Sequence, residues 1–277
     1  LIAQMILAMV KVRTVTLSEI ADGFAGKTKT ASNERRIRRF LSSFNLDLDF
    51  VALFVGGLLP GGRWLLTTDR TTWSFGTTTI NILVLGVVHK GVAVPLLWKF
   101  LPRCGNSDTA ERIEIMERFV RLFGAERAEA LLGDREFIGN EWLAWLRDSG
   151  IEVFIRIRED QLVENSRGEL IAASVLFRDL RAGETRVLSG LRKLGRACGE
   201  NGVRACVAVM RLESGELLIV VTFGDPRYAL DTYARRWEIE TMFACLKTRG
   251  FRLESTHIKD TDRLSRLLAI VVMAFVW

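Results

Sequence analysis

Three carboxylates in the sequence have the positions expected of a metal-dependent active site. Asp69 follows the apolar run in LLTTDRTTW, Asp134 follows the one in ALLGDREF, and Glu240 lies within YARRWEIETMFACLK. An aspartate directly after a buried strand lies at the edge of a sheet, where α/β folds collect their ligands. Taken singly, each aspartate is equally well explained as a turn cap or as a partner of the arginine that follows it, Arg70 or Arg135.

If the three carboxylates converge, they would hold two divalent cations roughly 4 Å apart. Mg²⁺ suits such a site because it prefers oxygen ligands and keeps waters and substrate phosphates in its shell. One ion would activate an attacking water or 3′-hydroxyl, and the other would stabilise the leaving oxygen. The chemistry that these residues predict is therefore phosphoryl transfer on a nucleic acid.

A helix is expected to carry Glu240, with a start signal at Asp225 and Pro226 and a stop at Gly250. At about 100° of rotation per helical residue, four polar side chains fall within an arc of about 60° and form a polar stripe. This stripe consists of Tyr233, Arg236, Glu240 and Lys247. The adjoining apolar stripe consists of Ile239, Met242, Phe243 and Leu246. The helix can therefore rest on a sheet and still present Glu240 beside bases that hold phosphates. An exposed amphipathic helix with an ordinary charged face explains the same spacing.

Residues 1–58 have a helical pattern, with Thr16 or Ser18 as the cap of a second helix and Ser32 or Asn33 as the cap of a third. The third helix is strongly basic. Its arginines are Arg35, Arg36, Arg38 and Arg39. Two interpretations stay open: a helix-turn-helix-like DNA-binding segment, or a solvated basic helix packed on the main domain.

Residues 59–158 are expected to form the first part of an α/β core. Three strand-length apolar runs are followed by a helix over 108–124, a strand at AEALLGD, a helix at NEWLAWLRDSG and a strand at IEVFIRI. This order is that of the RNase H-like fold, a mixed sheet flanked by helices. Residues 225–277 would supply its second part.

Residues 159–224 predict a β-rich insertion into that core. VRACVAVMRL and ELLIVVTF read as a hairpin joined at Glu213, Ser214 and Gly215, and ETRVLSGLRKLG reads as a further strand pair.

The composition fits a protein with a large core and a polyanionic partner. The chain has 277 residues, 49% of them hydrophobic, and a formal charge of +6. Four widely spaced cysteines, including Cys198, predict free thiols in a reduced cytoplasmic setting. The apolar runs at 1–10 and 264–277 are too short to span a bilayer, so we expect core helices of a fragment and no membrane partner.

The spacing of Tyr233, Arg236, Glu240 and Lys247 resembles the Y-R-E-K signature of the DDE transposases of bacterial insertion sequences, specifically the insertion-sequence-four family. TTDRTTW is similar to that family's first-aspartate motif, and GDREFIGNEWLAWL to its second. The resemblance covers residues 60 to 277.

The resemblance implies an RNase H-like core with a β-rich insertion, and a catalytic triad of Asp69, Asp134 and Glu240 that binds two Mg²⁺ or Mn²⁺ ions. It implies that Tyr233, Arg236 and Lys247 contact double-stranded DNA at the transposon's terminal inverted repeats. The implied reaction is cut-and-paste transposition into target DNA by a homodimer on paired ends, in the bacterial nucleoid and without a nucleotide cofactor.

One departure from the family concerns the aromatic residue that stacks on a flipped base. Members use an aromatic of the insertion, usually tryptophan, but residues 159–223 contain none, which leaves Phe177 or Phe223. Most tryptophans near the acidic motifs are expected in the core. These are Trp73, Trp142, Trp145 and Trp237. Two other functions stay open: an inactive or truncated DNA-binding relative, and another two-metal nuclease on the same fold.

Overall fold

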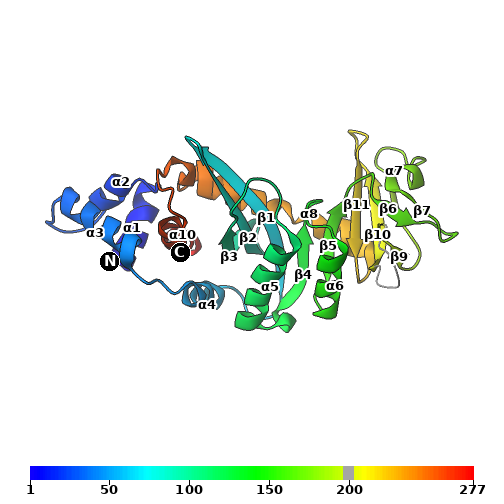
Figure 1. Ribbon diagram of the computed structural model, residues 1–277, viewed down its shortest axis with the longest axis horizontal. Helices are drawn as coiled ribbons and strands as arrows, with labels where there is room; N and C mark the ends of the chain where they lie inside the picture. Colours follow the sequence, from blue (N-terminus) through cyan, green and yellow to red (C-terminus); the bar gives the residue numbers. More distant parts are fainter. Residues whose placement is uncertain (196–202) are drawn as a thin grey trace. The chain divides into compact units, whose positions relative to one another are not determined.

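The computed structural model describes residues 1–195 and 203–277, which form two compact units (Figure 1). Unit 1 comprises Leu1–Gly61, Arg70–Gly105 and Glu238–Trp277, and unit 2 comprises Gly62–Asp69 and Asn106–Trp237. Strand β1, Trp64–Phe75, contributes its first part to unit 2 and its second part to unit 1. The two units are therefore described separately.

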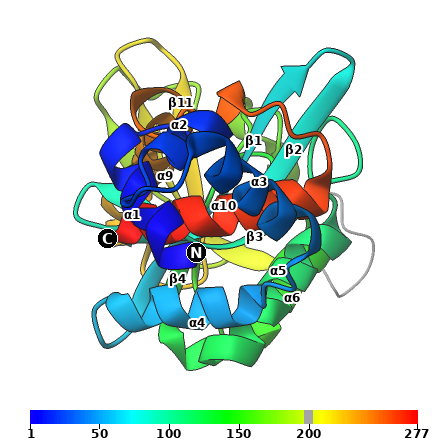
Figure 2. The same ribbon diagram turned by 90° about the vertical axis from the view of Figure 1, so that its left-hand side faces the viewer.

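Unit 1 is built around the C-terminal helix. Helix α10, Thr261–Val276, contacts three N-terminal helices and strand β3. Figure 2 shows α10 beside α1 and α3. The N-terminal helices are α1 Ile2–Val12, α2 Leu17–Asp22, α3 Thr30–Ser43 and α4 Leu48–Leu58. Because residues from Leu267 to Ala274 are buried, the apolar run at the end of the chain is a core helix, as predicted.

The predicted caps of the N-terminal helices are wrong in detail. Helix α3 begins at Thr30, and its N-cap is Lys29, which makes no capping hydrogen bond. Asn33, a predicted cap, is instead buried, and its amide donates to the carbonyl of Ala21 at 3.5 Å. Thr16 is the N-cap of α2 by position, but its side chain does not cap the helix.

The antiparallel hairpin in unit 1 matches the predicted strands. Strand β2, Thr78–His89, pairs with β3, Val92–Phe100, and their apolar runs are buried. The turn between them contains Gly91 at a φ of 88°, a conformation that glycine adopts without a steric cost. Trp73, on the unit 1 part of β1, is buried as expected.

Unit 2 has a mixed sheet with a parallel part and an antiparallel part. The first part of β1 pairs in parallel with β4, Ala128–Gly133, and β4 pairs in parallel with β5, Val153–Ile157. Helix α5, Thr109–Phe123, precedes β4, and helix α6, Asn140–Asp148, connects β4 to β5 (Figure 1). These elements confirm the predicted strand and helix order of a mixed α/β fold.

Helix α5 illustrates how the local sequence fixes an element. Asp108 accepts a hydrogen bond from the Glu111 backbone, and the Glu111 side chain accepts one from the Asp108 backbone. This capping box satisfies two N–H groups that the first turn leaves open. Phe119, on the buried face of the helix, packs its ring 6.5 Å from that of Trp64 on β1.

The β-rich insertion extends the sheet of unit 2. Strand β11, Leu217–Thr222, pairs antiparallel with β5, and β10, Arg204–Arg211, pairs with β11. The predicted pair β8, Thr185–Val187, and β9, Arg192–Lys193, is wrong in its partners, because both strands pair with β10. Apolar alternation reveals a strand but not which neighbour completes its hydrogen bonds.

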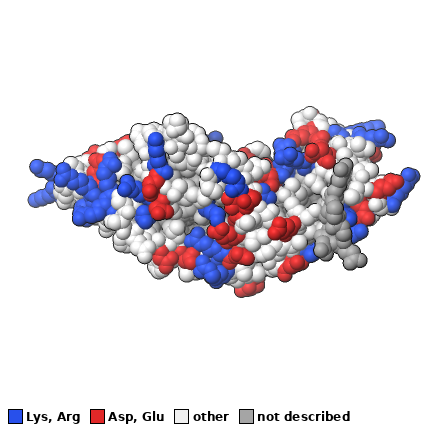
Figure 3. Space-filling view, viewed as in Figure 1, with Lys and Arg blue, Asp and Glu red and all other residues white. Residues whose placement is uncertain are grey.

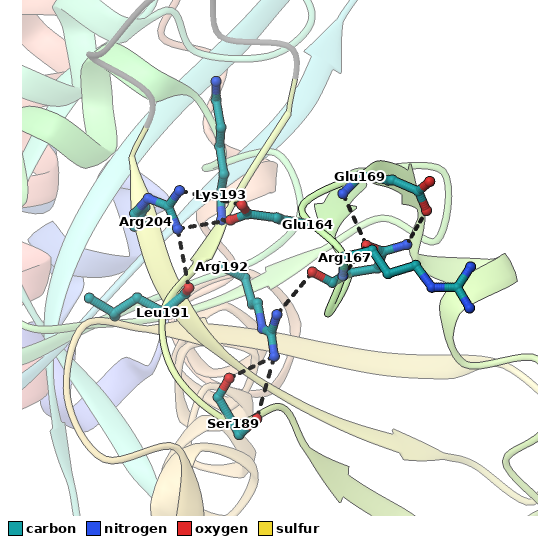
Figure 4. Close-up of polar contacts among 9 residues, drawn as sticks. Glu164, Arg167, Glu169, Ser189, Leu191, Arg192, Lys193 and Arg204 are labelled. Carbon is teal, nitrogen blue, oxygen red and sulfur yellow. Dashed lines mark hydrogen bonds and ion pairs between the residues drawn. The ribbon is translucent and has the colours of Figure 1, made fainter.

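A second, small hairpin in the insertion is not evident from the sequence pattern. It comprises β6, Leu162–Glu164, and β7, Leu170–Ala172, followed by the short helix α7, Ala173–Leu176. Figure 4 shows Glu164 accepting hydrogen bonds from the Lys193 backbone and the Arg204 guanidinium. The hydrogen bond from the Lys193 backbone and then the Arg204 guanidinium lower the pKa of Glu164. These polar contacts hold the small hairpin against β9 and β10.

The single helix predicted between Asp225 and Gly250 is broken in the structure. Asp225 caps the 3₁₀ turn η2, Pro226–Tyr228, as the start signal indicated. Two α-helices and a π-helical turn follow: α8 Ala229–Ala234, α9 Trp237–Ala244 and η3 Cys245–Arg249. The backbone N–H groups of Arg235 and Arg236 donate to carbonyl oxygens three residues back. Such bonds are those of a 3₁₀-helix, in which successive residues are rotated by about 120°. The uniform rotation assumed for the polar stripe therefore does not apply across this segment.

In the described parts of the chain, no single helix is long and apolar enough to cross a membrane. The bent pair α3 and α4 passes the length and composition test only when taken together. Cys104, Cys206 and Cys245 are free thiols, and Cys198 lies outside the described residues.

Candidate active site

Asp69 and Asp134 are carried by two adjacent parallel strands, with Asp69 within β1 and Asp134 directly after β4. The register of β1 and β4 pairs Thr68 with Gly133, and each aspartate is the next residue of its chain. Residues in register on neighbouring parallel strands project to the same face, so continuing this register by one residue brings the two aspartates side by side. The prediction that Asp134 directly follows a buried strand is confirmed, whereas the prediction for Asp69 is wrong, because Asp69 lies within β1 and not at its end. The structure adds that the two strands are neighbours.

Arg236 reaches this pair of carboxylates from the segment between α8 and α9. Its Nη1 atom lies 3.4 Å from Oδ2 of Asp69. The Arg236 side chain is 8% exposed and that of Asp69 is 21% exposed. Oδ1 of Asp134 accepts a hydrogen bond from the backbone N–H of Arg135, and this bond helps to fix the carboxylate.

Tyr233 lies in the same group of residues. It is buried on α8, and this burial raises the pKa of its phenol to about 12. The charge of Asp134 adds to the increase in pKa, while those of Arg236 and Arg156 oppose it. The Arg236 guanidinium lies 5.9 Å from the centre of the Tyr233 ring. Unit 2 thus brings together four residues that the sequence singled out: Asp69, Asp134, Tyr233 and Arg236.

Arg156 is a charged residue on β5, the neighbour of β4, that the sequence reasoning missed. The register of β4 and β5 pairs Gly133 with Ile155. Asp134 is the residue after Gly133, and Arg156 is the residue after Ile155. The signal was present in IEVFIRI, where an arginine interrupts an apolar run near its end. Its meaning depends on strand register, which a single sequence does not reveal.

Glu240 and Lys247 belong to unit 1. Glu240 lies on α9 and is half-buried, and the apolar stripe beside it is largely buried as predicted. Lys247, in the π-helical turn, donates to the carbonyl of Thr72 at 3.0 Å and pairs with Glu254 at 2.6 Å. Within the residues that the structure describes, no group of three or more His, Cys, Asp or Glu side chains has the arrangement of a metal site. The triad with Glu240 therefore remains a prediction.

The N-terminal arginines lie on helix α3. Arg35, Arg38 and Arg39 are exposed, and Arg36 is half-buried. Arg38 pairs with Glu34 at 2.5 Å, and Arg36 donates to the side chain of Asn33. Figure 3 shows Lys and Arg side chains gathered over this part of unit 1. The helix thus presents a basic surface, which both sequence interpretations allow.

The aromatic residues near the site do not all lie in the core. Trp142 is buried and stacks on the half-buried Trp145 with their ring centroids 6.0 Å apart. Trp237 is 63% exposed, although most of the four tryptophans are expected in the core. Its ring lies 5.4 Å from the guanidinium of Arg236. Phe177 is fully buried, so it is not accessible for stacking on a base in this structure, whereas Phe223 is partly exposed.

The chain belongs to the transposase DDE domain family. The family model matches residues 103–277, which is more than half of the chain. This segment includes Asp134 and Glu240 and begins after Asp69. No curated protein matches the chain significantly.

The fold is similar to that of a solved transposase. The match is a piggyBac transposase in a synaptic complex with hairpin DNA, with a TM-score of 0.53 and 12% identity over 99% of this chain. The chain spans 64% of the length of that transposase. At 12% identity, the likeness shows the fold alone. The catalytic domain of human endonuclease V is also matched, at 12% identity over 78% of this chain and 92% of that one, but its TM-score is only 0.38.

Proposed function

We propose that this protein is a DNA transposase of the insertion-sequence-four type. It would hydrolyse the phosphodiester backbone at the ends of its element and join the freed 3′-hydroxyl to target DNA. The observation that carries this proposal is the adjacent pair Asp69 and Asp134 with Arg236 and Tyr233 beside it. Membership of the transposase DDE domain family supports it independently.

The two aspartates fit a divalent cation such as Mg²⁺. Mg²⁺ is held in proteins by one or two carboxylates together with waters and substrate phosphates. Asp69 and Asp134 supply two carboxylates from neighbouring strands, and both remain partly accessible. When bound, the metal would supply activation of a nucleophile and stabilisation of the leaving oxygen. We propose that Glu240 completes the site as a third carboxylate.

The remaining signature residues would hold and orient the DNA strand. Arg236 presents a guanidinium, whose planar fork matches the oxygens of a phosphate. The Tyr233 phenol keeps its proton because burial raises its pKa to about 12, so it can donate a hydrogen bond at neutral pH. Lys247 would contribute a further positive charge.

Double-stranded DNA is the proposed partner, bound as the terminal repeats and as the target, by a homodimer. The similar piggyBac transposase was solved in a synaptic complex with hairpin DNA, which supports DNA as the class of substrate. We propose that the exposed Arg35 and Arg39 contact DNA phosphates from helix α3. Replacing either by alanine would then weaken binding equally for all sequences and lower the salt slope by about one.

A cleavage assay tests the proposal. The substrate is a labelled duplex that carries the inverted repeat found beside the gene, incubated with Mg²⁺ and compared between the wild-type protein, Glu240→Gln and Asp134→Asn. We expect a nick at the 3′ end of the repeat with the wild type and none with either variant. Asp179→Asn is the matched control, because Asp179 is an exposed carboxylate of the insertion that pairs with Arg186.

Three outcomes would contradict the proposal. Equal nicking by the wild type and both variants would show that Asp134 and Glu240 are not catalytic. Nicking without preference for the repeat would instead indicate a general two-metal nuclease. End binding by the wild type without any nicking would favour a DNA-binding relative that has lost its activity.

A further inference from the structure

The register of the parallel strands in unit 2 places three charged residues in a row across them. The register pairs Thr68 with Gly133 and Gly133 with Ile155. The next residues along β1, β4 and β5 are therefore Asp69, Asp134 and Arg156, in that spatial order. Because residues in register share a face of the sheet, the row places a guanidinium on the far side of Asp134 from Asp69.

The Arg156 side chain is held in place and largely buried. Its Nη2 atom lies 2.5 Å from Oε1 of Glu216 and 3.4 Å from the carbonyl oxygen of Leu217. The side chain is 16% exposed, while that of Glu216 is 42% exposed. The Nε atom is buried and has no acceptor among the described residues. A buried donor that the protein leaves without an acceptor needs an explanation, such as a ligand at a functional site.

The charge of Arg156 acts on the candidate active site. It lowers the pKa of the Tyr233 phenol, whereas the charge of Asp134 raises it. An arginine in a row with two aspartates is chemically different from a third carboxylate, because it attracts phosphate oxygens. Its fork can contact two of them at once.

We propose that Arg156 is a phosphate-binding residue that positions the DNA strand over Asp69 and Asp134. This inference rests on the proposed function and adds a residue outside the Y-R-E-K signature. Arg156 would bind from β5, while Arg236 contacts the opposite end of the row at Asp69. The two guanidiniums would flank the carboxylate pair and hold the strand on both sides of the bond to be cut.

A purely structural role is the alternative. In that case Arg156 would only tie β5 to the start of β11 through Glu216. The Glu216→Gln variant separates the two roles, because it weakens the tie but keeps the guanidinium. A structural role predicts that Glu216→Gln and Arg156→Ala have similar effects on DNA binding, whereas a phosphate contact predicts an effect of Arg156→Ala alone.

The test replaces single phosphates of the cleaved strand by uncharged methylphosphonates. The wild-type protein, Arg156→Ala, Arg156→Lys and Glu216→Gln are compared by fluorescence anisotropy on the end duplex in Ca²⁺ and by nicking in Mg²⁺. We expect Arg156→Ala to bind the unmodified duplex about 10- to 100-fold more weakly, with a salt slope lower by about one. One methylphosphonate position should weaken the wild type by a similar factor and leave Arg156→Ala unchanged.

The lysine variant and a surface arginine complete the design. Arg156→Lys keeps the charge but not the fork, so we expect it to lie between the wild type and the alanine variant. It also carries the test if Arg156→Ala does not fold, as judged by urea unfolding. Arg186→Ala is the matched control, because Arg186 also pairs with a carboxylate but lies on β8 and is 38% exposed.

The proposal is overturned if every methylphosphonate position affects Arg156→Ala as strongly as the wild type. It is also overturned if Glu216→Gln reproduces the loss caused by Arg156→Ala. Failure of the proposed function has a different signature, since the wild type itself would then neither prefer nor nick the end duplex.

Discussion

The guanidinium of Arg236 contacts the carboxylate of Asp69, with 3.4 Å between Nη1 and Oδ2. Asp134 is the next residue across the sheet, so Arg236 provides positive charge where two like charges adjoin. In the protein without a metal, this contact offsets the repulsion between the carboxylates. A divalent cation bound between them would take over part of that role.

Replacing Arg236 by alanine should therefore destabilise the metal-free protein. This hydrogen bond is part-buried and charge-assisted, and removal of one partner of such a bond costs about 1–3 kcal/mol of unfolding free energy. We expect this loss in urea unfolding with EDTA, and a larger stabilisation by Mg²⁺ in the variant than in the wild type. Arg186→Ala, at an exposed ion pair, should cost at most about 1 kcal/mol. Equal losses in the two variants would show that the Arg236 contact has no special importance for stability.

Tyr233 should make the stability of the protein depend on pH in the alkaline range. Its pKa is raised from 10.0 to about 12 in the folded protein, because burial disfavours the phenolate. Such a group contributes stability that is fully present below pH 10 and is lost as the pH rises through the folded pKa. The contribution is about 2–3 kcal/mol.

The Tyr233→Phe variant measures this contribution. Urea unfolding between pH 9 and pH 12, roughly the range between the two pKa values, should show a steeper loss of stability for the wild type than for the variant. Tyr228→Phe is the control, because Tyr228 is 62% exposed and is the other tyrosine of the chain. Parallel pH profiles for the wild type and Tyr233→Phe would contradict the raised pKa.

The sequence predicts the parts of this site that depend on local pattern. Asp69 and Asp134 are found because each directly follows a buried apolar run, and β1 to β5 follow runs bounded by glycines or helix caps. Arg156 is not found, because its importance comes from the register of β5 on β4. Strand neighbours are set by contacts between distant parts of the chain, which a single sequence shows only through a family resemblance.

The helix around the signature shows a second limit of sequence reasoning. An uninterrupted α-helix is the simplest structure for YARRWEIETMFACLK, and the apolar stripe that it predicts is largely buried. The break at Arg235 and Arg236 has no Pro or Gly to announce it. The break coincides with the placement of Arg236 on Asp69, a tertiary contact. Trp237 is exposed at the same position, contrary to the core location expected of a large aromatic.

Gly250 should be required for the π-helical turn that carries Lys247. A Cβ atom at this position would clash with the carbonyl oxygen of Cys245, so the backbone could not remain in place. We expect Gly250→Ala to cost about 1–3 kcal/mol of unfolding free energy, as other insertions of a methyl group into a packed site do. Urea unfolding would measure this cost.

A second glycine provides the control for that experiment. Gly57 lies near the end of helix α4, and a Cβ atom added there would have no neighbour within 4 Å. Gly57→Ala should therefore be neutral or stabilising by up to about 1 kcal/mol. If both alanine variants behave alike, the close approach of the chain at Gly250 is not a constraint on the fold.

Trp237 should contribute to DNA binding and little to stability. Its ring is 63% exposed beside the Arg236 guanidinium, so it offers a flat apolar surface next to the proposed phosphate site. Stacking of a base on an aromatic side chain is worth about 1–3 kcal/mol per base. Trp237→Ala should thus weaken binding of a single-stranded overhang by about 5- to 150-fold, with unchanged urea unfolding.

Trp237→Phe should retain most of the affinity, because a smaller aromatic can still stack. Trp277→Ala is the control, because Trp277 is 81% exposed at the C-terminal end of α10. Equal binding by the wild type and Trp237→Ala would show that the exposed ring does not contact the strand.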